Sequence, residues 1–183
     1  MDALMNLATA FGLSTSAGLN AYIPLLTVAL LGRYTDLVKL QGRWAALTNG
    51  WVIALLVVLL AVEVVADKVP AVDSLNDLIQ TIVRPTAGAI LFAATSGDVL
   101  QLHPALAMAL GVILAGSVHA VKATGRPVVT ATTGGTANAL VSTMEDVVAT
   151  VLSLIAVILP YLVLLLAILL LASLLLWRRR KRL

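Results

Sequence analysis

Four long stretches with almost no charge constrain what this chain can fold into. They cover residues 3–32, 45–66, 85–121 and 138–177, and each holds at most two residues of Asp, Glu, Lys or Arg. A helix that crosses a bilayer needs about 20 mostly apolar residues. Only 11% of the 183 residues are charged, whereas a soluble domain averages about 25%. We therefore predict an all-α fold, a polytopic transmembrane helical bundle that forms a single domain over residues 1–183.

Pro160 lies in the middle of the last apolar stretch. A single helix over residues 147–177 would be about 46 Å long, well beyond the hydrocarbon core of about 30 Å. Proline fits the first position of a helix and disrupts a helix interior. We therefore expect two spans, 138–159 and 161–177, with one tilted helix kinked at Pro160 as the alternative.

Two of the other stretches are also interrupted. Asp98 separates a short apolar segment, 86–97, from a segment long enough to span, 104–121. Residues 3–32 are interrupted by hydroxyl-bearing residues, glycine and asparagine within 14–20. The chain is therefore expected to cross the membrane about five times, with broken or re-entrant helices.

The basic residues predict how the chain is oriented. Five of the 12 basic residues are in the tail, residues 177–183. Because basic segments tend to stay in the cytoplasm, the tail is expected inside, together with the loops at 33–43 and 122–126. The acidic loop 67–84 is expected outside, with residues 73–83 lying at that surface as an amphipathic helix or covering a cavity mouth. The N-terminus is then outside and the C-terminus inside. A cleavable signal peptide is not expected, because Lys and Arg are absent before residue 33.

A weak internal echo relates two apolar segments. Similar residues recur at a constant spacing between 60–68 and 114–122. Under the predicted orientation these two helices cross in opposite directions, as an inverted-topology repeat requires. The alternative is a chance match of Leu, Ala and Val in an apolar chain.

Small and hydroxyl-bearing residues interrupt the apolar pattern at two places. Non-helical backbone at membrane depth is tolerated only where it is buried in protein or lines a wet cavity, and helix N-termini there attract anions. We predict half-helices that line a substrate path, with close helix packing through small residues and a simple loop as alternatives. The candidate path residues are Ser14, Thr15, Ser16, Gly18, Asn20, Thr132, Thr133, Gly134, Gly135, Thr136 and Asn138.

Acidic residues within apolar segments are costly and are therefore candidates for function. A carboxylate at that depth should pair with a base or hold a proton. We predict cation or proton coupling through these acids, with structural ion pairs or a position at the interface as the alternative. The candidate ion-coupling residues are Glu63, Asp67, Glu145 and Asp146, and the candidate counter-charges are Lys68, Arg84, Lys122 and Arg126.

The run Ser-Thr-Ser-Ala-Gly-Leu-Asn-Ala-Tyr-Ile-Pro at residues 14–24 resembles a known family. Together with Thr-Gly-Gly-Thr-Ala-Asn at 133–138 and the basic tail, it is similar to a bacterial integral-membrane family catalogued as domain of unknown function 4126. The resemblance covers nearly the whole chain. It implies a polytopic protein of the bacterial cytoplasmic (inner) membrane, and it implies no particular activity.

These patterns exclude several classes of function. The chain has no cysteine and only two histidines, so neither a metal site nor a cofactor is expected. No Gly-rich phosphate loop or catalytic triad order is apparent, and too little solvated surface remains for nucleic-acid binding. We expect a small transporter or channel that works as a homo-oligomer in contact with membrane lipid, with an unidentified solute or ion. The alternative is a structural or accessory membrane subunit that could bind lipid.

Overall fold

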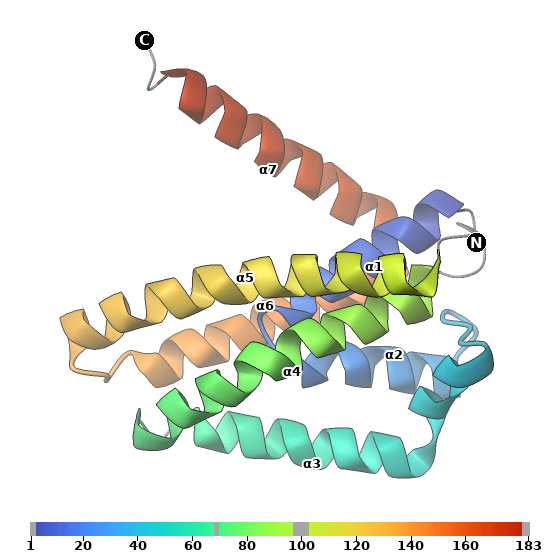
Figure 1. Cartoon of the computed structure of the whole chain (residues 1–183), viewed down its shortest axis with the longest axis horizontal. Helices are drawn as coiled ribbons and strands as arrows, with labels where there is room; N and C mark the ends of the chain where they lie inside the picture. Colours follow the sequence, from blue (N-terminus) through green and yellow to red (C-terminus); the bar gives the residue numbers. More distant parts are fainter. Residues whose placement is uncertain (1–2, 68–69, 97–102, 181–183) are drawn as a thin grey trace.

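The computed structural model describes residues 3–67, 70–96 and 103–180, and within these ranges it contains helices and no strands. Figure 1 shows a bundle whose helices lie mostly along one long axis. In chain order the elements are α1 (Ala3–Ala17), α2 (Tyr22–Tyr34), the 3-10 helix η1 (Gly42–Thr48), α3 (Gly50–Ala66), α4 (Pro70–Ser96), α5 (Pro104–Thr133), α6 (Asn138–Ile158) and α7 (Pro160–Arg180).

Several of these helices can cross a membrane. Asn76–Ser96 of α4, all of α5 and all of α6 are each long and apolar enough, and η1 with α3, bent by 61°, would make a fourth span. Helix α2 and Pro160–Ser173 of α7 are shorter apolar helices. The chain is thus a multi-pass helical bundle, as its composition predicts.

Helices α1 and α2 form a hairpin that enters the bundle and returns to the same end (Figure 1). Asn6 near the start of α1 and residues 36–44 after α2 line one cavity, whereas Asn20 between the helices is buried. With 15 and 13 residues, the helices are only about 22 and 20 Å long, short of the hydrocarbon core. Residues 3–32 are therefore a re-entrant pair and not the single interrupted crossing counted from the sequence.

Asn20 explains why the chain turns at this position. Its side-chain Oδ1 accepts hydrogen bonds from the backbone N–H groups of Tyr22 and Ile23, at 2.9 and 3.1 Å. Asparagine is a favoured residue for capping helix starts in this way. Its own N–H donates to Ser16 O at 3.2 Å, so one residue closes α1 and begins α2.

The predicted loops at 67–84 and 122–126 are wrong. The structure shows helix at 70–84 and at 122–126, because α4 continues through Pro85 and α5 continues through Pro127. The helix predicted at 73–83 is present, but it is the first part of α4, which continues into the bundle, and not a separate helix at the surface. The predicted segments 86–97 and 104–121 are likewise shorter than the helices that contain them, α4 and α5. Basic residues predict loops at these positions, but Arg84, Lys122 and Arg126 are buried against acids from neighbouring helices, so they do not end a span.

Pro160 separates two helices, as predicted. Helix α6 ends at Ile158, and α7 begins at Pro160 itself. Figure 1 shows α7 leaving the bundle at an angle, with only its first turns near α1. Val163 in those turns is buried, and Gly12 of α1 approaches it.

The internal echo does not relate helices of opposite direction. Gly42, just before α3, and Pro104, the first residue of α5, line the same cavity, so both helices start at one end of the bundle. Figure 1 shows α3 and α5 running the same way along the long axis. The inverted repeat predicted for 60–68 and 114–122 is therefore wrong, because the hairpin changes the number of crossings before α3.

Small residues allow α4 and α5 to approach closely. A Cβ at Gly88 would lie 2.5 Å from the Ala115 methyl and 2.6 Å from Gly111 O, and a Cβ at Gly111 would overlap Gly88 O. Such contacts replace the hydrophobic driving force that helices lack within lipid.

We predict that Gly111→Ala destabilises the bundle, because the added methyl must push α4 and α5 apart. Overpacking of this kind costs about 1–3 kcal/mol, measurable as a lower midpoint of thermal unfolding in detergent. Gly125→Ala on the same helix is the matched control, since a Cβ there meets nothing within 4 Å. Equal midpoints for the two variants would contradict the close approach.

Candidate functional site

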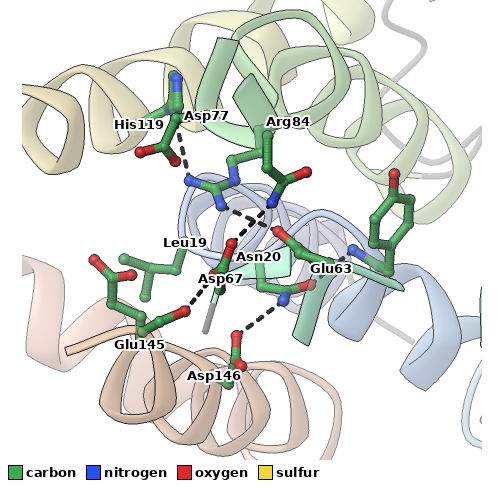
Figure 2. A network of polar contacts seen from close by, with 12 residues as sticks. Leu19, Asn20, Glu63, Asp67, Asp77, Arg84, His119, Glu145 and Asp146 are labelled. Atoms are coloured by element: carbon green, nitrogen blue, oxygen red, sulfur yellow. Dashed lines mark hydrogen bonds and ion pairs between the residues drawn. The ribbon is translucent and has the colours of Figure 1, made fainter. Parts of the chain in front are cut away.

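Charged side chains from four helices gather around the break between α1 and α2 (Figure 2). We call this group the charge network. Its acids are Glu63, Asp67, Asp77, Glu145 and Asp146, and its bases are Arg84, Lys122 and Arg126. The sequence predicts seven of these eight residues as candidate site residues, and the structure brings all seven together. Lys68, the remaining predicted counter-charge, lies outside the described residues.

Four ion pairs connect the helices of the network. The distances are 3.1 Å for Arg84–Glu63, 2.7 Å for Lys122–Glu145, 2.6 Å for Arg126–Asp77 and 3.7 Å for Arg126–Asp67. Each pair joins two different elements among α3, its C-terminal cap residue Asp67, α4, α5 and α6. The Arg84 and Glu63 side chains are 0% and 2% exposed, so this pair is fully desolvated.

His119 contacts the network and is neutral. Its Nδ1 lies 3.1 Å from Nη1 of Arg84, and its Nε2 lies 3.1 Å from Oγ1 of Thr81. Because guanidinium nitrogens only donate, Nδ1 must be the acceptor and Nε2 carries the hydrogen. The Thr81 hydroxyl donates to Asp77 O at 2.9 Å and is free to accept from Nε2. His119 therefore orients Arg84 without adding charge.

Asp67 joins three elements at the end of α3. Its carboxylate accepts hydrogen bonds from the Ser142 hydroxyl on α6 and, at 2.8 Å, from Nδ2 of Asn76 on α4. It also pairs with Arg126 on α5. Because its carboxylate contacts three neighbouring helices, Asp67 holds the end of α3 in place, whatever further role it has.

Asp146 differs from the other four acids. Its carboxylate accepts a hydrogen bond from Nδ2 of Asn20 at 2.9 Å. Among the described residues, no base lies within ion-pair distance of Asp146. Asn20 cannot turn away freely, because its Oδ1 is held by the start of α2. Its amide NH₂ group therefore points at Asp146, as Figure 2 shows.

Among the residues that the structure describes, the network has more acids than bases. Five acids face three bases, so with all of them ionised and His119 neutral the group carries a charge of −2. Arg126 pairs with two acids, and no described base pairs with Asp146. A cation or a proton would balance this excess.

The network extends from the middle of the bundle towards one end. Asp146 lies about 12 Å along α6 from its first residue and about 18 Å from its last. Glu145 and Asp77 have side chains that are 17% and 23% exposed. The group is therefore open on one side, whereas Asn20 at its centre is buried.

Most predicted path residues near the break are packed against neighbouring helices. The Ser14 hydroxyl donates to Gly88 O at 3.0 Å, and the Ser16 hydroxyl donates to Ala149 O at 2.8 Å. Thr15 donates to Phe11 O within its own helix. A Cβ at Gly18 would lie 2.5 Å from Ala115 O. These contacts match the alternative of close packing, and Asn20 is the path candidate that contacts the network.

The second predicted break is a turn at the end of the bundle. Gly134 caps α5 with φ of 60°, Gly135 has φ of 83°, and Thr132, Gly134 and Thr136 are exposed. Glycine adopts these dihedral angles without strain. This stretch is therefore the simple loop of the three alternatives, not a half-helix.

Thr133 and Asn138, two further residues of the second predicted break, lie close to the turn after α5. The Thr133 hydroxyl donates to Val129 O at 2.7 Å. Asn138 begins α6 and is buried, with Nδ2 3.0 Å from the Thr130 hydroxyl. It is about 12 Å along α6 from Asp146, so the two predicted breaks lie at different depths.

Asp77 is the network residue that sequence reasoning placed elsewhere, in an outer loop. Helical spacing carried the missing signal. His119, Lys122 and Arg126 lie three and four residues apart, and Asp77 and Arg84 lie seven apart, so each set shares one helix face. A helix over the first segment puts Asp77 on the same face as Arg84, inside a span and not in a loop, whereas its contact with Arg126 is seen only in the structure.

The fold and the network define a multi-pass membrane protein with a re-entrant hairpin and buried, acid-rich polar contacts. The family described as "Domain of unknown function (DUF4126)" matches residues 7–180, and the chain belongs to that family. No curated protein and no solved structure matches it.

We predict that Arg84→Met destabilises the protein more than Arg84→Met combined with Glu63→Leu. Removing one partner of a buried pair leaves an uncompensated charge and costs about 3–5 kcal/mol, whereas replacing both is often neutral. Thermal unfolding of the single and double variants in detergent measures the difference. Additive losses in the double variant would show that the pair is not coupled.

Proposed function

We propose that this protein is a small transporter or channel. It moves a cation, which can be the proton, across the membrane, or it couples the movement of a solute to that of the cation. The observation that carries the proposal is Asp146, a carboxylate at mid-depth that no described base neutralises. Ionisable groups in membrane spans are costly and mark ion pathways or proton relays. Asp146 is thus the proposed ion-binding group, and the other acids of the network set the preference for cations.

Asn20 can couple ion binding at Asp146 to the position of the hairpin formed by α1 and α2. One side of its amide donates to Asp146, and the other side holds the start of α2. A cation or proton that occupies the carboxylate competes with this hydrogen bond. Occupancy of Asp146 is thereby linked to the position of the hairpin, the kind of discontinuous element that forms transporter binding sites.

The net charge of the network supports cation entry from one side. Glu145 and Asp77 are partly exposed and lie between Asp146 and the end of the bundle that holds the turn after α5. Acidic groups in a low-dielectric surrounding raise the local concentration of cations. Rings of acids serve cation channels in the same way.

A structural or accessory subunit is the second candidate, and one observation favours it. Ser14, Ser16 and Gly18 are buried in tight contacts with neighbouring helices, as small residues are in bundles that only pack. Under this proposal the network holds the helices together and no flux occurs.

The proposed setting is a bacterial inner membrane, with the chain associated as a homo-oligomer. We propose that the basic tail is cytoplasmic, because five of the 12 basic residues are there and basic segments resist translocation. The N-terminus is then outside. Because residues after α2 line the same cavity as Asn6 near the start of α1, the basic loop at 33–43, which the sequence predicts inside, is also outside under this proposal. Exposed apolar side chains on α5, α6 and α7 are the proposed surface for lipid and for further copies of the chain.

We predict that Asp146→Asn lowers cation or proton flux in proteoliposomes by about tenfold or more, the loss expected when a charged ligand worth about 1.5–3 kcal/mol is removed. Flux is measured separately with Na⁺, K⁺ and pH gradients. Asp36→Asn is the matched control, because it removes one acid outside the network and should leave flux unchanged.

Two results would count against the proposal. Unaltered flux in folded Asp146→Asn would reject Asp146 as the ion-binding group. Absence of flux in the wild-type protein under all three gradients, with normal thermal unfolding, would favour the accessory subunit.

A further inference from the structure

A cavity of about 780 Å³ lies at the end of the bundle opposite the turn after α5. It is lined from the start of α1, the segment after α2, the end of α4, the start of α5 and the end of α6. Its volume falls within the range of about 300–1,000 Å³ that holds small ligands. None of the charge network lines it, so it is a separate feature of the molecule.

The polar side of the cavity is cationic. Lys39 and Arg43 line it together with one acid, Asp36. Within the described ranges no acid lies within ion-pair distance of Lys39 or Arg43. Arg43 lies 6.0 Å from the ring centre of Trp44, which also lines the cavity. The lining residues that the structure describes therefore have one cation in excess, in contrast to the acid-rich network.

Thr9 also lines the cavity. It is 5% exposed, and its Oγ1 has no hydrogen-bond partner among the described residues. Other threonines in these helices bond a carbonyl one turn earlier, as Thr15 and Thr27 do. Leaving such a group unsatisfied costs about 1–3 kcal/mol, so an oxygen-bearing ligand would gain by accepting from Thr9.

Part of the remaining wall is apolar. This apolar part is formed by Leu37, Val38, Ala93, Ala94, Ala107 and Val157, whereas Asn6, Gln41, Thr95 and Ser96 add polar groups. A free inorganic anion would match the cations but not the apolar part. A lipid with an anionic head group matches both, and the cavity lies at an end of a membrane bundle, where head groups are.

We propose that this cavity binds the phosphate-bearing head group of one anionic phospholipid. Lys39 and Arg43 receive the phosphate oxygens, since both side chains are donors and none of the described acids pairs with them. Thr9 donates to an ester or glycerol oxygen, and the apolar wall contacts the first methylene groups. The bound lipid links the N-terminal half of the hairpin to the ends of α4 and α6.

Native mass spectrometry and thermal unfolding of the full chain in detergent test the proposal. Phosphatidylglycerol should bind one molecule per chain at saturation and raise the unfolding midpoint, with an affinity about tenfold or more above that of phosphatidylcholine. Glycerol phosphate and inorganic phosphate separate a lipid site from a phosphate site. A shift from either that equals the shift from phosphatidylglycerol would overturn the lipid assignment.

Variants locate the lipid in the cavity. Lys39→Gln with Arg43→Gln should abolish the preference for phosphatidylglycerol. Lys181→Gln with Arg182→Gln removes the same charge from the basic tail and should retain the preference. Thr9→Val should weaken phosphatidylglycerol binding about 2- to 10-fold, the range for one hydrogen bond, without lowering the unfolding midpoint of the lipid-free protein. Full preference in the first variant, loss of it in the tail variant, or unchanged binding in Thr9→Val would overturn the proposal.

Discussion

Neutralisation of buried charge is the constraint on which this bundle depends. Arg84 and Glu63 are almost fully desolvated, and ions in such surroundings cost several kcal/mol each unless they are paired. The pairs join α3 to α4, α4 to α5, and α5 to α6. Four helices are thereby held at a relative depth and rotation that non-directional apolar contacts alone would not specify.

Small residues then determine how closely the helices meet. Gly88 and Gly111 bring α4 against α5, and Ser14 donates to the Gly88 carbonyl from α1. This layered contact allows a hairpin of two short helices to lie inside the bundle, where its break is buried in protein. Exposed to lipid, the same break would leave backbone groups unsatisfied. The close packing of the helices and the buried break between α1 and α2 therefore depend on each other.

The two ends of the molecule have opposite chemical character. The acid-rich network extends from Asn20 and Asp146 towards the turn after α5, whereas the cavity at the other end presents Lys39 and Arg43. The hairpin connects them, because Thr9 in α1 lines the cavity and Asn20 contacts the network. Our two proposals accordingly assign a cation to the middle of the bundle and an anionic lipid to its end.

The sequence by itself determined the membrane class, the break near Asn20, the helix boundary at Pro160 and seven of the eight network residues, because hydropathy, proline and buried charge act locally. It did not determine where α4 and α5 begin and end, the return of α2 to the same end as the start of α1, or the common direction of α3 and α5. Those features depend on contacts between residues of different helices. Arg84, Lys122 and Arg126 would mark loops in isolation, and only the tertiary structure, by placing acids against them, makes them interior residues of helices.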